Sequence, residues 1–245
     1  MSDPNLSLTE HLKDLRDCII RSFIIVMFGF LASWAYSETL FDIIRKPIQP
    51  FVNGLVFTGV MDKFIAHMKV SLLSGIIITC PLWLYQVWRF VKPGLYQKEK
   101  KAIIAFLAVG TFLFLAGVAF VYFIVFPFAF EFLMSFAGNT DSPMITIDEY
   151  LSFFISTTLM FGVVFELPLA LTLLGMLGIV NAQFLRSSRR YALVVIAIVS
   201  AVITPPDVLS MVCIMVPLQL LYELSIFSVA FFGKRANTSS TEVSV

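Results

Sequence analysis

The sequence predicts an all-α integral membrane protein with six transmembrane helices, of which the fifth and sixth are short. Of its 245 residues, 59% are hydrophobic and 13% are charged, whereas soluble domains carry about 25% charged residues. Six apolar segments recur along the chain, at residues 18–36, 70–91, 102–127, 151–177, 191–203 and 209–228. We expect residues 1–233 to form one transmembrane domain and the polar residues 234–245 to form a disordered tail.

The first helix is expected to begin ahead of the first apolar segment. Ser7 and Glu10 have the spacing of a capping box, which predicts a helix start at Leu8. The apolar residues that follow fall on one face of this helix, namely Leu8, Leu12, Leu15 and Ile19. This beginning is expected to lie on the membrane surface. Acids and bases are mixed over the first turns and no small-residue cleavage site follows, so we expect no cleavable signal peptide.

Residues 37–69 form a long connection between the first two apolar segments. The connection contains Pro47, Pro50, Gly54 and Gly59, which are residue types common in turns. Residues 40–48, however, carry apolar side chains at helical spacing. We therefore expect a structured cap over one end of the helices rather than a loose loop.

The positive charges are divided unevenly between the two sides of the membrane. Six spans place both termini on one side, and 13 of the 17 Lys and Arg residues then lie on that side. The other four all lie in the connection of residues 37–69. Because cytoplasmic loops carry the excess of Lys and Arg, both termini are expected in the cytoplasm and the cap outside it.

The fourth apolar segment contains an acid near its middle. Glu166 follows Gly162 by four residues and precedes Pro168 by two. An ionisable group at that depth is costly, so it usually faces protein or water rather than lipid. Pro168 lacks a backbone N–H and predicts a bend, and Gly162 places a notch on the same face as the carboxyl. Glu166 is either a protonated residue bonded to a neighbouring helix or a functional acid, and we favour the functional acid.

The fifth apolar segment is short for a membrane span. Residues 191–203 extend about 20 Å as a helix, against a hydrocarbon core of about 30 Å. The segment is therefore either a tilted helix extended by residues 187–190 or part of a hairpin that thins the bilayer locally.

Five further polar residues are candidates for binding or packing. Asp14 and Glu99 are expected on the cytoplasmic side. Either Asp14 pairs along its helix with Lys13 or Arg16 and Glu99 is a solvated helix start among lysines, or both point into one recess that accepts guanidinium groups. Asp207 follows two prolines on the outer side and is expected to cap the sixth helix. Gln219 and Glu223 share a face one turn apart, where hydrogen bonding between helices is the simpler role.

The sequence offers no enzyme or cofactor motif. It contains no H-E-x-x-H, no G-x-S-x-G and no phosphate-binding glycine loop. His11 and His67 lie far apart, and the three cysteines are dispersed. We therefore expect no catalytic activity, cofactor or metal. A small-solute or ion transporter that uses Glu166 is the alternative, although no internal repeat supports it. An intramembrane hydrolase would need a nucleophile and a base, and we find no convincing pair.

Four motifs follow one another along the chain: His11-Leu12-Lys13-Asp14-Leu15-Arg16, Phe90 with Pro93-Gly94-Leu95-Tyr96 and Glu99, the segment 161–168, and Thr204-Pro205-Pro206-Asp207. In order and position they resemble those of TatC, the multi-spanning core subunit of the twin-arginine protein translocase. The resemblance covers nearly the whole chain, from Leu8 to Phe232. Pro47 also matches a family position.

This resemblance implies a concave bundle in the cell inner membrane that binds signal peptides bearing paired arginines. The implied partners are TatA- and TatB-type single-span subunits, folded precursor proteins, further copies of the chain and membrane lipid, with no nucleic acid. The implied energy source is the proton-motive force.

The resemblance also implies roles for individual residues. Asp14 and Glu99 look like the residues that contact the arginine pair, with Arg16 and Phe90 shaping that site. Glu166 looks like the polar residue that lines the concave face within the membrane.

On the far side of the membrane, Pro47, Thr204 and Asp207 look like residues of the outer turn and partner contact. Two positions depart from the family pattern. Asp14 stands where the family mostly has Glu, which keeps the charge and shortens its reach. Met211 stands where some relatives carry Gln, which puts polar docking of a partner helix there in doubt.

Overall fold

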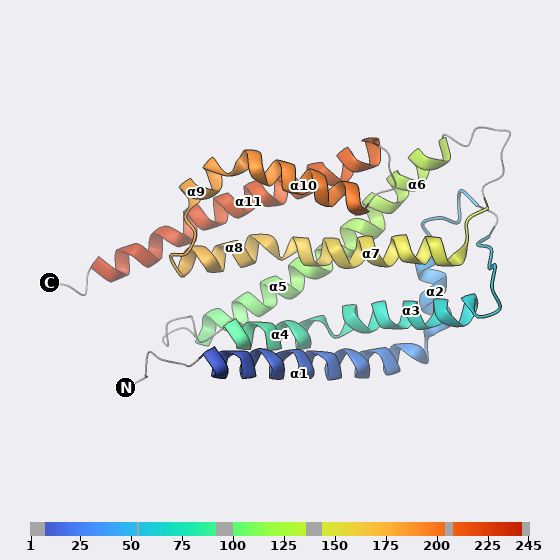
Figure 1. Ribbon diagram of the computed structural model, residues 1–245, viewed down its shortest axis with the longest axis horizontal. Helices are drawn as coiled ribbons and strands as arrows, with labels where there is room; N and C mark the ends of the chain where they lie inside the picture. Colours follow the sequence, from blue (N-terminus) through green and yellow to red (C-terminus); the bar gives the residue numbers. More distant parts are fainter. Residues whose placement is uncertain (1–7, 53, 92–99, 136–143, 204–207, 242–245) are drawn as a thin grey trace.

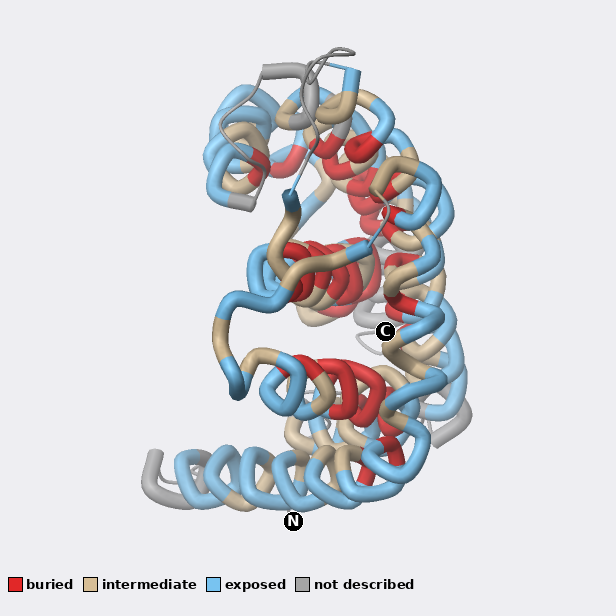
Figure 2. Tube along the Cα trace, turned by 90° about the vertical axis from the view of Figure 1, so that its right-hand side faces the viewer, coloured by how far each residue is buried: buried red, intermediate tan, exposed pale blue. Residues whose placement is uncertain are grey.

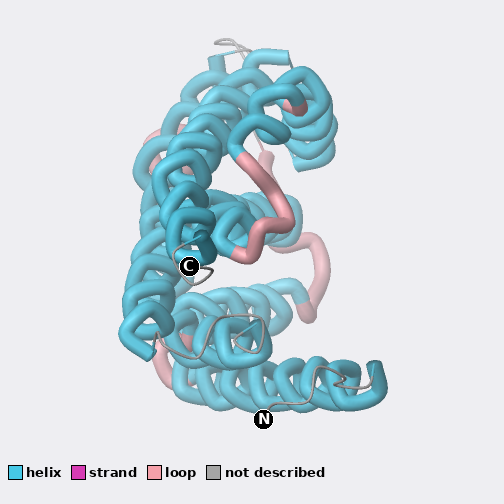
Figure 3. Tube along the Cα trace, turned by 90° about the vertical axis from the view of Figure 1, so that its left-hand side faces the viewer, coloured by secondary structure: helices cyan, strands magenta, loops and turns pink. Residues whose placement is uncertain are grey.

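The computed structural model describes residues 8–52, 54–91, 100–135, 144–203 and 208–241, and its regular elements are helices (Figure 1). They are α1 (Leu8–Trp34), α2 (Ser37–Arg45), α3 (Asp62–Ile78), α4 (Cys80–Val91), α5 (Lys100–Phe120), the π-helical turn η2 (Val121–Val125), α6 (Phe126–Ser135), α7 (Ile147–Phe165), α8 (Leu167–Met176), α9 (Ala182–Ser187), α10 (Arg189–Ile203) and α11 (Val208–Thr241). The all-α class is confirmed. Viewed from its ends, the molecule is a curved wall of helices rather than a closed bundle (Figures 2 and 3).

Several helices are long and apolar enough to cross a membrane. Among the described residues these are Ile104–Ser135, Ile147–Met176 and Ile214–Phe231. Two bent helix pairs qualify only when each pair is taken together: Leu12–Trp34 with α2, bent by 89°, and Asp62–Ile78 with Cys80–Phe90, bent by 59°. The chain is thus a membrane protein with several apolar helices.

The bend between α3 and α4 has a chemical cause. Pro81 provides no backbone N–H, so a carbonyl of the preceding turn loses its helical partner. The Thr79 hydroxyl donates to the carbonyl of Gly75 at 2.7 Å, and the Trp83 indole N–H donates to the carbonyl of Ile76 at 3.0 Å. Side chains therefore satisfy carbonyls at the break, as an interruption within a bilayer requires.

Pro217 lies inside α11, and two further prolines in the described helices are accommodated differently. Pro127 follows the π-helical turn η2, whose wider winding gives room for the ring, and the helix continues to Ser135, beyond the expected end of the third segment at residue 127. Pro168 is the second residue of α8, where a missing N–H has little consequence. The interruption expected there is confined to Glu166, and Ile147–Met176 still forms one apolar span.

The last helix differs from the prediction. α10 has 15 residues and is short as expected, but α11 has 34 residues, so the prediction of a short sixth helix was wrong. Hydropathy marks where an apolar segment ends, whereas a helix, once nucleated, propagates into the polar residues beyond it. α11 ends at Thr241, inside residues 234–245, and the disorder of that tail stays a prediction.

Small residues bring α1 into close contact with α3. A Cβ atom added at Gly75 would lie 2.6 Å from the backbone nitrogen of Phe30, and one added at Gly29 would lie 2.8 Å from the Gly75 carbonyl oxygen. The two backbones therefore touch, which is typical of helix pairs in membranes. This contact fixes α1 against the rest of the wall.

Helix α2 is held across one end of the molecule by two tyrosines. Tyr122 donates to the carbonyl of Ile43 at 2.8 Å, and Tyr150 donates to that of Ile44 at 2.5 Å. Both carbonyls belong to the last turn of α2, where helical N–H donors run out, although the Ile43 carbonyl also accepts from the Lys46 N–H at 3.2 Å. Below α2 lies the largest core cluster, whose fully buried members include Ile48, Val70, Val121, Phe126 and Leu151.

Candidate functional site

Asp14 lies on the exposed surface of α1, one turn and a half from its start. Its carboxylate has no ion pair with another described residue. The Arg16 guanidinium instead bonds to Asp17, with N–O distances of 3.1 and 2.9 Å. The pairing of Asp14 with Arg16, which the sequence left open, is therefore not made, and the Asp14 carboxylate faces solvent.

Helix α4 ends close to the beginning of α1. The two helices pack side by side, and α1 begins at the end of the molecule where α4 stops and α5 starts (Figure 1). Phe90, in the last turn of α4, is half-buried, and Arg89 beside it is exposed. The structure thus brings Asp14, Arg16 and Phe90 to one end of the molecule. Glu99 lies outside the described residues, immediately before α5.

Glu166 separates α7 from α8 and faces α5. A Cβ atom added at Gly110 of α5 would lie 3.2 Å from Glu166 Oε2, so the carboxyl packs directly on the α5 backbone. One turn earlier in α7, the glycine lies on α7 and the side chain on α5: a Cβ added at Gly162 would lie 2.6 Å from the ring of Phe114. The notch expected at Gly162 is therefore present, but the Phe114 ring fills it.

The Glu166 carboxyl is incompletely bonded. The residue is half-buried, and its Oε1 atom is shielded from solvent without a hydrogen-bond partner in the described part of the chain. A buried acceptor left unpaired costs about 1–3 kcal/mol, and more when charged. The packing of α5, α7 and α8 thus encloses a carboxyl oxygen that is unbonded among the described residues.

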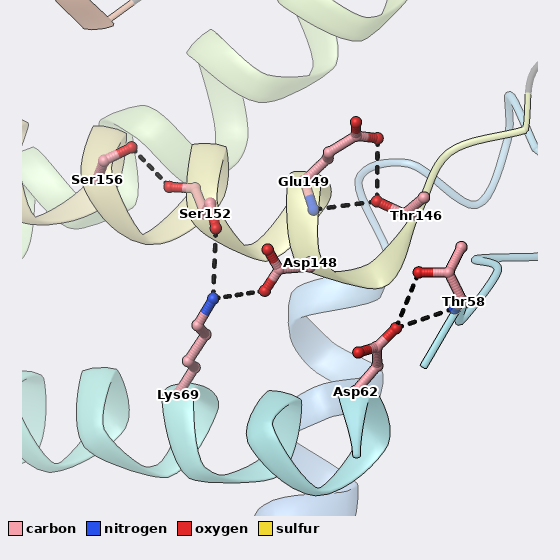
Figure 4. A network of polar contacts seen from close by, with 8 residues as sticks. All are labelled: Thr58, Asp62, Lys69, Thr146, Asp148, Glu149, Ser152 and Ser156. Carbon is pink, nitrogen blue, oxygen red and sulfur yellow. Dashed lines mark hydrogen bonds and ion pairs between the residues drawn. The ribbon is translucent and has the colours of Figure 1, made fainter. Parts of the chain in front are cut away.

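A polar network lies near the opposite end of α7, beside α2 and the start of α3 (Figure 4). Lys69 Nζ of α3 lies 2.6 Å from Asp148 Oδ1 and 3.4 Å from the Ser152 hydroxyl, so one side chain bridges α3 and α7. At the start of α7, Thr146 accepts from the Glu149 backbone N–H and donates to the Glu149 carboxylate. Sequence reasoning missed the bridge, because no local spacing relates residues 79 positions apart.

The Lys69–Asp148 bridge should contribute little to stability. Its side chains are 34% and 61% exposed, and exposed ion pairs contribute about 0–1 kcal/mol. We expect Lys69→Met and Asp148→Asn each to lower the melting temperature in detergent by at most about 4 °C, and the double variant to lose less than the sum. Lys63→Met, at an exposed lysine on the same helix, is the matched control. A fall in melting temperature well above this range would show that the Lys69–Asp148 ion pair stabilises the protein more than an exposed ion pair does.

The remaining outer residues are only partly placed. Pro47 is half-buried in the turn that follows α2, next to fully buried Ile48. Thr204 and Asp207 lie outside the described residues, so the expected helix cap by Asp207 stays a prediction.

An ion pair joins the last two long helices at the end of the molecule that also holds α9. Arg189 at the start of α10 donates to Glu223 of α11 at 2.6 Å, and the Tyr222 hydroxyl donates to the Leu185 carbonyl at 2.9 Å. Glu223 thus bonds between helices, as its simpler role predicted, through an arginine rather than through Gln219. Within the described residues, no cluster of His, Cys, Asp or Glu has a geometry that would hold a metal ion.

These features define a polytopic helical membrane protein whose curved wall carries an acid inside an apolar span and, at one end, an exposed carboxylate without an ion pair among the described residues. The chain belongs to the TatC family: the family model for Sec-independent protein translocase protein TatC matches residues 10–217. The resemblance seen in the sequence is therefore confirmed.

Relatives cover almost the whole chain. TatC of Desulforapulum autotrophicum is 41% identical over 237 residues, which cover 96% of this chain and 88% of that protein. TatC of Aquifex aeolicus is 37% identical over 97% of this chain and 99% of that protein. The fold is similar to a crystal structure of the twin arginine translocase receptor TatC, with a TM-score of 0.82 and 37% identity over 93% of this chain and all of that one.

Proposed function

We propose that this chain is the receptor subunit of a twin-arginine protein translocase, with six spans and both termini in the cytoplasm of a cell whose inner membrane it occupies. Residues 1–233 act as one domain. Family membership supports this role, and it does not favour a small-solute or ion transporter. The asymmetric distribution of Lys and Arg supports the orientation.

The signal peptide binds at the cytoplasmic end, where α1 begins and α4 stops. Its two arginines donate to Asp14 and Glu99, because a guanidinium matches a carboxylate bidentately. The observation that carries this assignment is the exposed Asp14 carboxylate, unpaired although Arg16 lies two residues away. Arg16 is engaged by Asp17, so it does not compete for Asp14. Phe90 offers a half-buried ring beside the site for the apolar part of the peptide.

Transport itself is assigned to the curved face and to partner subunits. The apolar part of the signal peptide moves along the face near Glu166, whose carboxyl accepts a donor from a TatA- or TatB-type helix. Pro47, Thr204 and Asp207 shape the outer turns that contact partners. The chain catalyses no covalent reaction and binds no cofactor, several copies assemble, and the proton-motive force drives transport.

Site-specific photo-crosslinking tests the receptor role. A photoreactive residue at position 89 is exposed beside Phe90 and replaces none of the proposed ligands. In membranes that contain the partner subunits, we expect it to crosslink to a precursor with paired arginines and much less to the same precursor with paired lysines. The same residue at exposed position 63, on the opposite end of the wall, is the control. Equal crosslinking of both precursors at position 89 would contradict the proposal.

A further inference from the structure

The turn between α2 and α3 exposes apolar side chains to an unusual degree. Val60 is fully exposed, and Phe57 and Met61 are 62% and 66% exposed. Each such side chain gains about 1.5–3 kcal/mol when it is fully withdrawn from water. A water-soluble surface rarely concentrates apolar side chains in this way without a binding partner.

The turn is ordered by hydrogen bonds. Asp62 Oδ2 accepts from the backbone N–H groups of Thr58 and Gly59, at 2.9 and 2.7 Å, and from the Thr58 hydroxyl at 3.2 Å (Figure 4). The Asp62 N–H in turn donates to the Gly59 carbonyl at 3.2 Å. The Asp62 carboxylate is therefore hydrogen-bonded within the turn, and the apolar side chains of the turn point away from the protein.

The exposed apolar surface continues from this turn along one side of α3. Its members recur at spacings of three and four residues and include no charged residue: Met61, Phe64, Ile65, Met68 and Leu72. The Phe64 ring contacts Trp34 of α1, with centroids 5.8 Å apart, so the surface extends onto the exposed apolar side of α1. Helices α1 and α3 belong to the two bent pairs that are long and apolar enough to span a membrane when each pair is taken together.

We propose that the 57–61 turn is a membrane anchor that inserts Phe57, Val60 and Met61 into the lipid leaflet bordering α2. Lipid is the partner that fits this turn, because the exposed apolar side chains of the turn continue into those of α3 and α1. The stripe that joins them contains no charged residue. Exposed Lys63 lies in the first turn of α3, next to this turn. The strength of interfacial binding rises with the apolar area that is buried and with the attraction of basic residues to anionic lipid.

Insertion of this turn has a structural consequence for α2. The turn and the tyrosine-bonded end of α2 belong to the same connection, so lipid contact would hold the connection at a fixed depth. This proposal requires a membrane-embedded chain but is independent of signal-peptide binding.

Spin-label accessibility in proteoliposomes of phosphatidylethanolamine and phosphatidylglycerol tests the anchor. Cys18 and Cys213 are replaced by alanine, the fully buried Cys80 is kept, and single cysteines are labelled at positions 57, 60 and 49. Gln49, exposed and polar in the same connection, is the control. Oxygen is enriched in lipid and the water-soluble nickel chelate is excluded from it. We therefore expect oxygen to relax the labels at positions 57 and 60 more than the chelate does, and the chelate to relax the label at position 49 more than oxygen does.

Two results would overturn the anchor. Nickel access at position 60 equal to that at 49 would place the turn in water. Low access of both reagents, with spin–spin broadening that grows with protein density, would mean that a second copy covers the turn. As a further arm, Val60→Asp should move the label at position 57 toward higher nickel access. Because Val60 contacts no core, this variant should fold, and an unchanged label would contradict insertion.

Discussion

A Glu166→Leu variant is expected to unfold at a higher temperature than the wild-type protein and yet to support no transport. Leu has a volume similar to that of Glu and fits against Gly110 without an unpaired oxygen. Removing a shielded, unbonded acceptor should recover about 1–3 kcal/mol, which raises the melting temperature by roughly 2–12 °C for a chain of this size. Transport should be lost because no acceptor remains for the partner helix.

The control for this prediction is Glu166→Gln, which keeps the shape and an accepting oxygen without the charge. We expect it to retain part of the transport activity. Both variants should still crosslink to the precursor from position 89, because the cytoplasmic site lies elsewhere. Transport at the wild-type rate by Glu166→Leu, measured in vesicles with the partner subunits, would remove Glu166 from the mechanism.

A Gly75→Ala variant should destabilise the protein strongly, although alanine normally favours a helix over glycine by about 1 kcal/mol. The new methyl group would lie 2.6 Å from the backbone of Phe30, which cannot turn aside as a side chain can. Helix α1 must then move away from α3. Overpacking of this kind costs about 1–3 kcal/mol, so the melting temperature in detergent should fall by roughly 2–12 °C.

The matched control is Gly54→Ala, because an added Cβ at Gly54 meets nothing within 4 Å. It should leave the melting temperature unchanged or slightly raised, since alanine restricts the unfolded chain. Gly75→Ala should also weaken signal-peptide binding, because α1 carries Asp14. If both variants melted alike, the backbone contact between α1 and α3 would not be the stabilising feature that we describe.

The sequence was most informative where an interaction is local. The apolar segments predicted the helices, the spacing of Ser7 and Glu10 predicted that the first helix begins at Leu8, and Pro168 predicted the interruption at Glu166. The break before Pro81 was not predicted. The 3.6-residue period and the chemistry of proline act within one or two turns, so they can be read without a structure. Motif order also identified the family correctly.

Contacts between distant segments were beyond such reasoning. Nothing local relates Gly110 to Glu166, Lys69 to Asp148 or Trp83 to the free carbonyl of Ile76. The length of α11 was misjudged for a related reason, since hydropathy describes burial in lipid and not hydrogen bonding along the backbone. At the proposed peptide site, the sequence made Asp14 a candidate, and only the structure revealed that Arg16 is bonded to Asp17 instead.

The central claim is that the carboxylates of Asp14 and Glu99 accept the paired arginines, and peptide affinity in nanodiscs tests it most directly. Each charged hydrogen-bonding group contributes about 1.5–3 kcal/mol, so Asp14→Asn combined with Glu99→Gln should weaken the binding of a twin-arginine peptide at least about a hundredfold. The double variant should also bind twin-arginine and twin-lysine peptides equally. Wild-type affinity and wild-type preference for arginine in that variant would contradict the account.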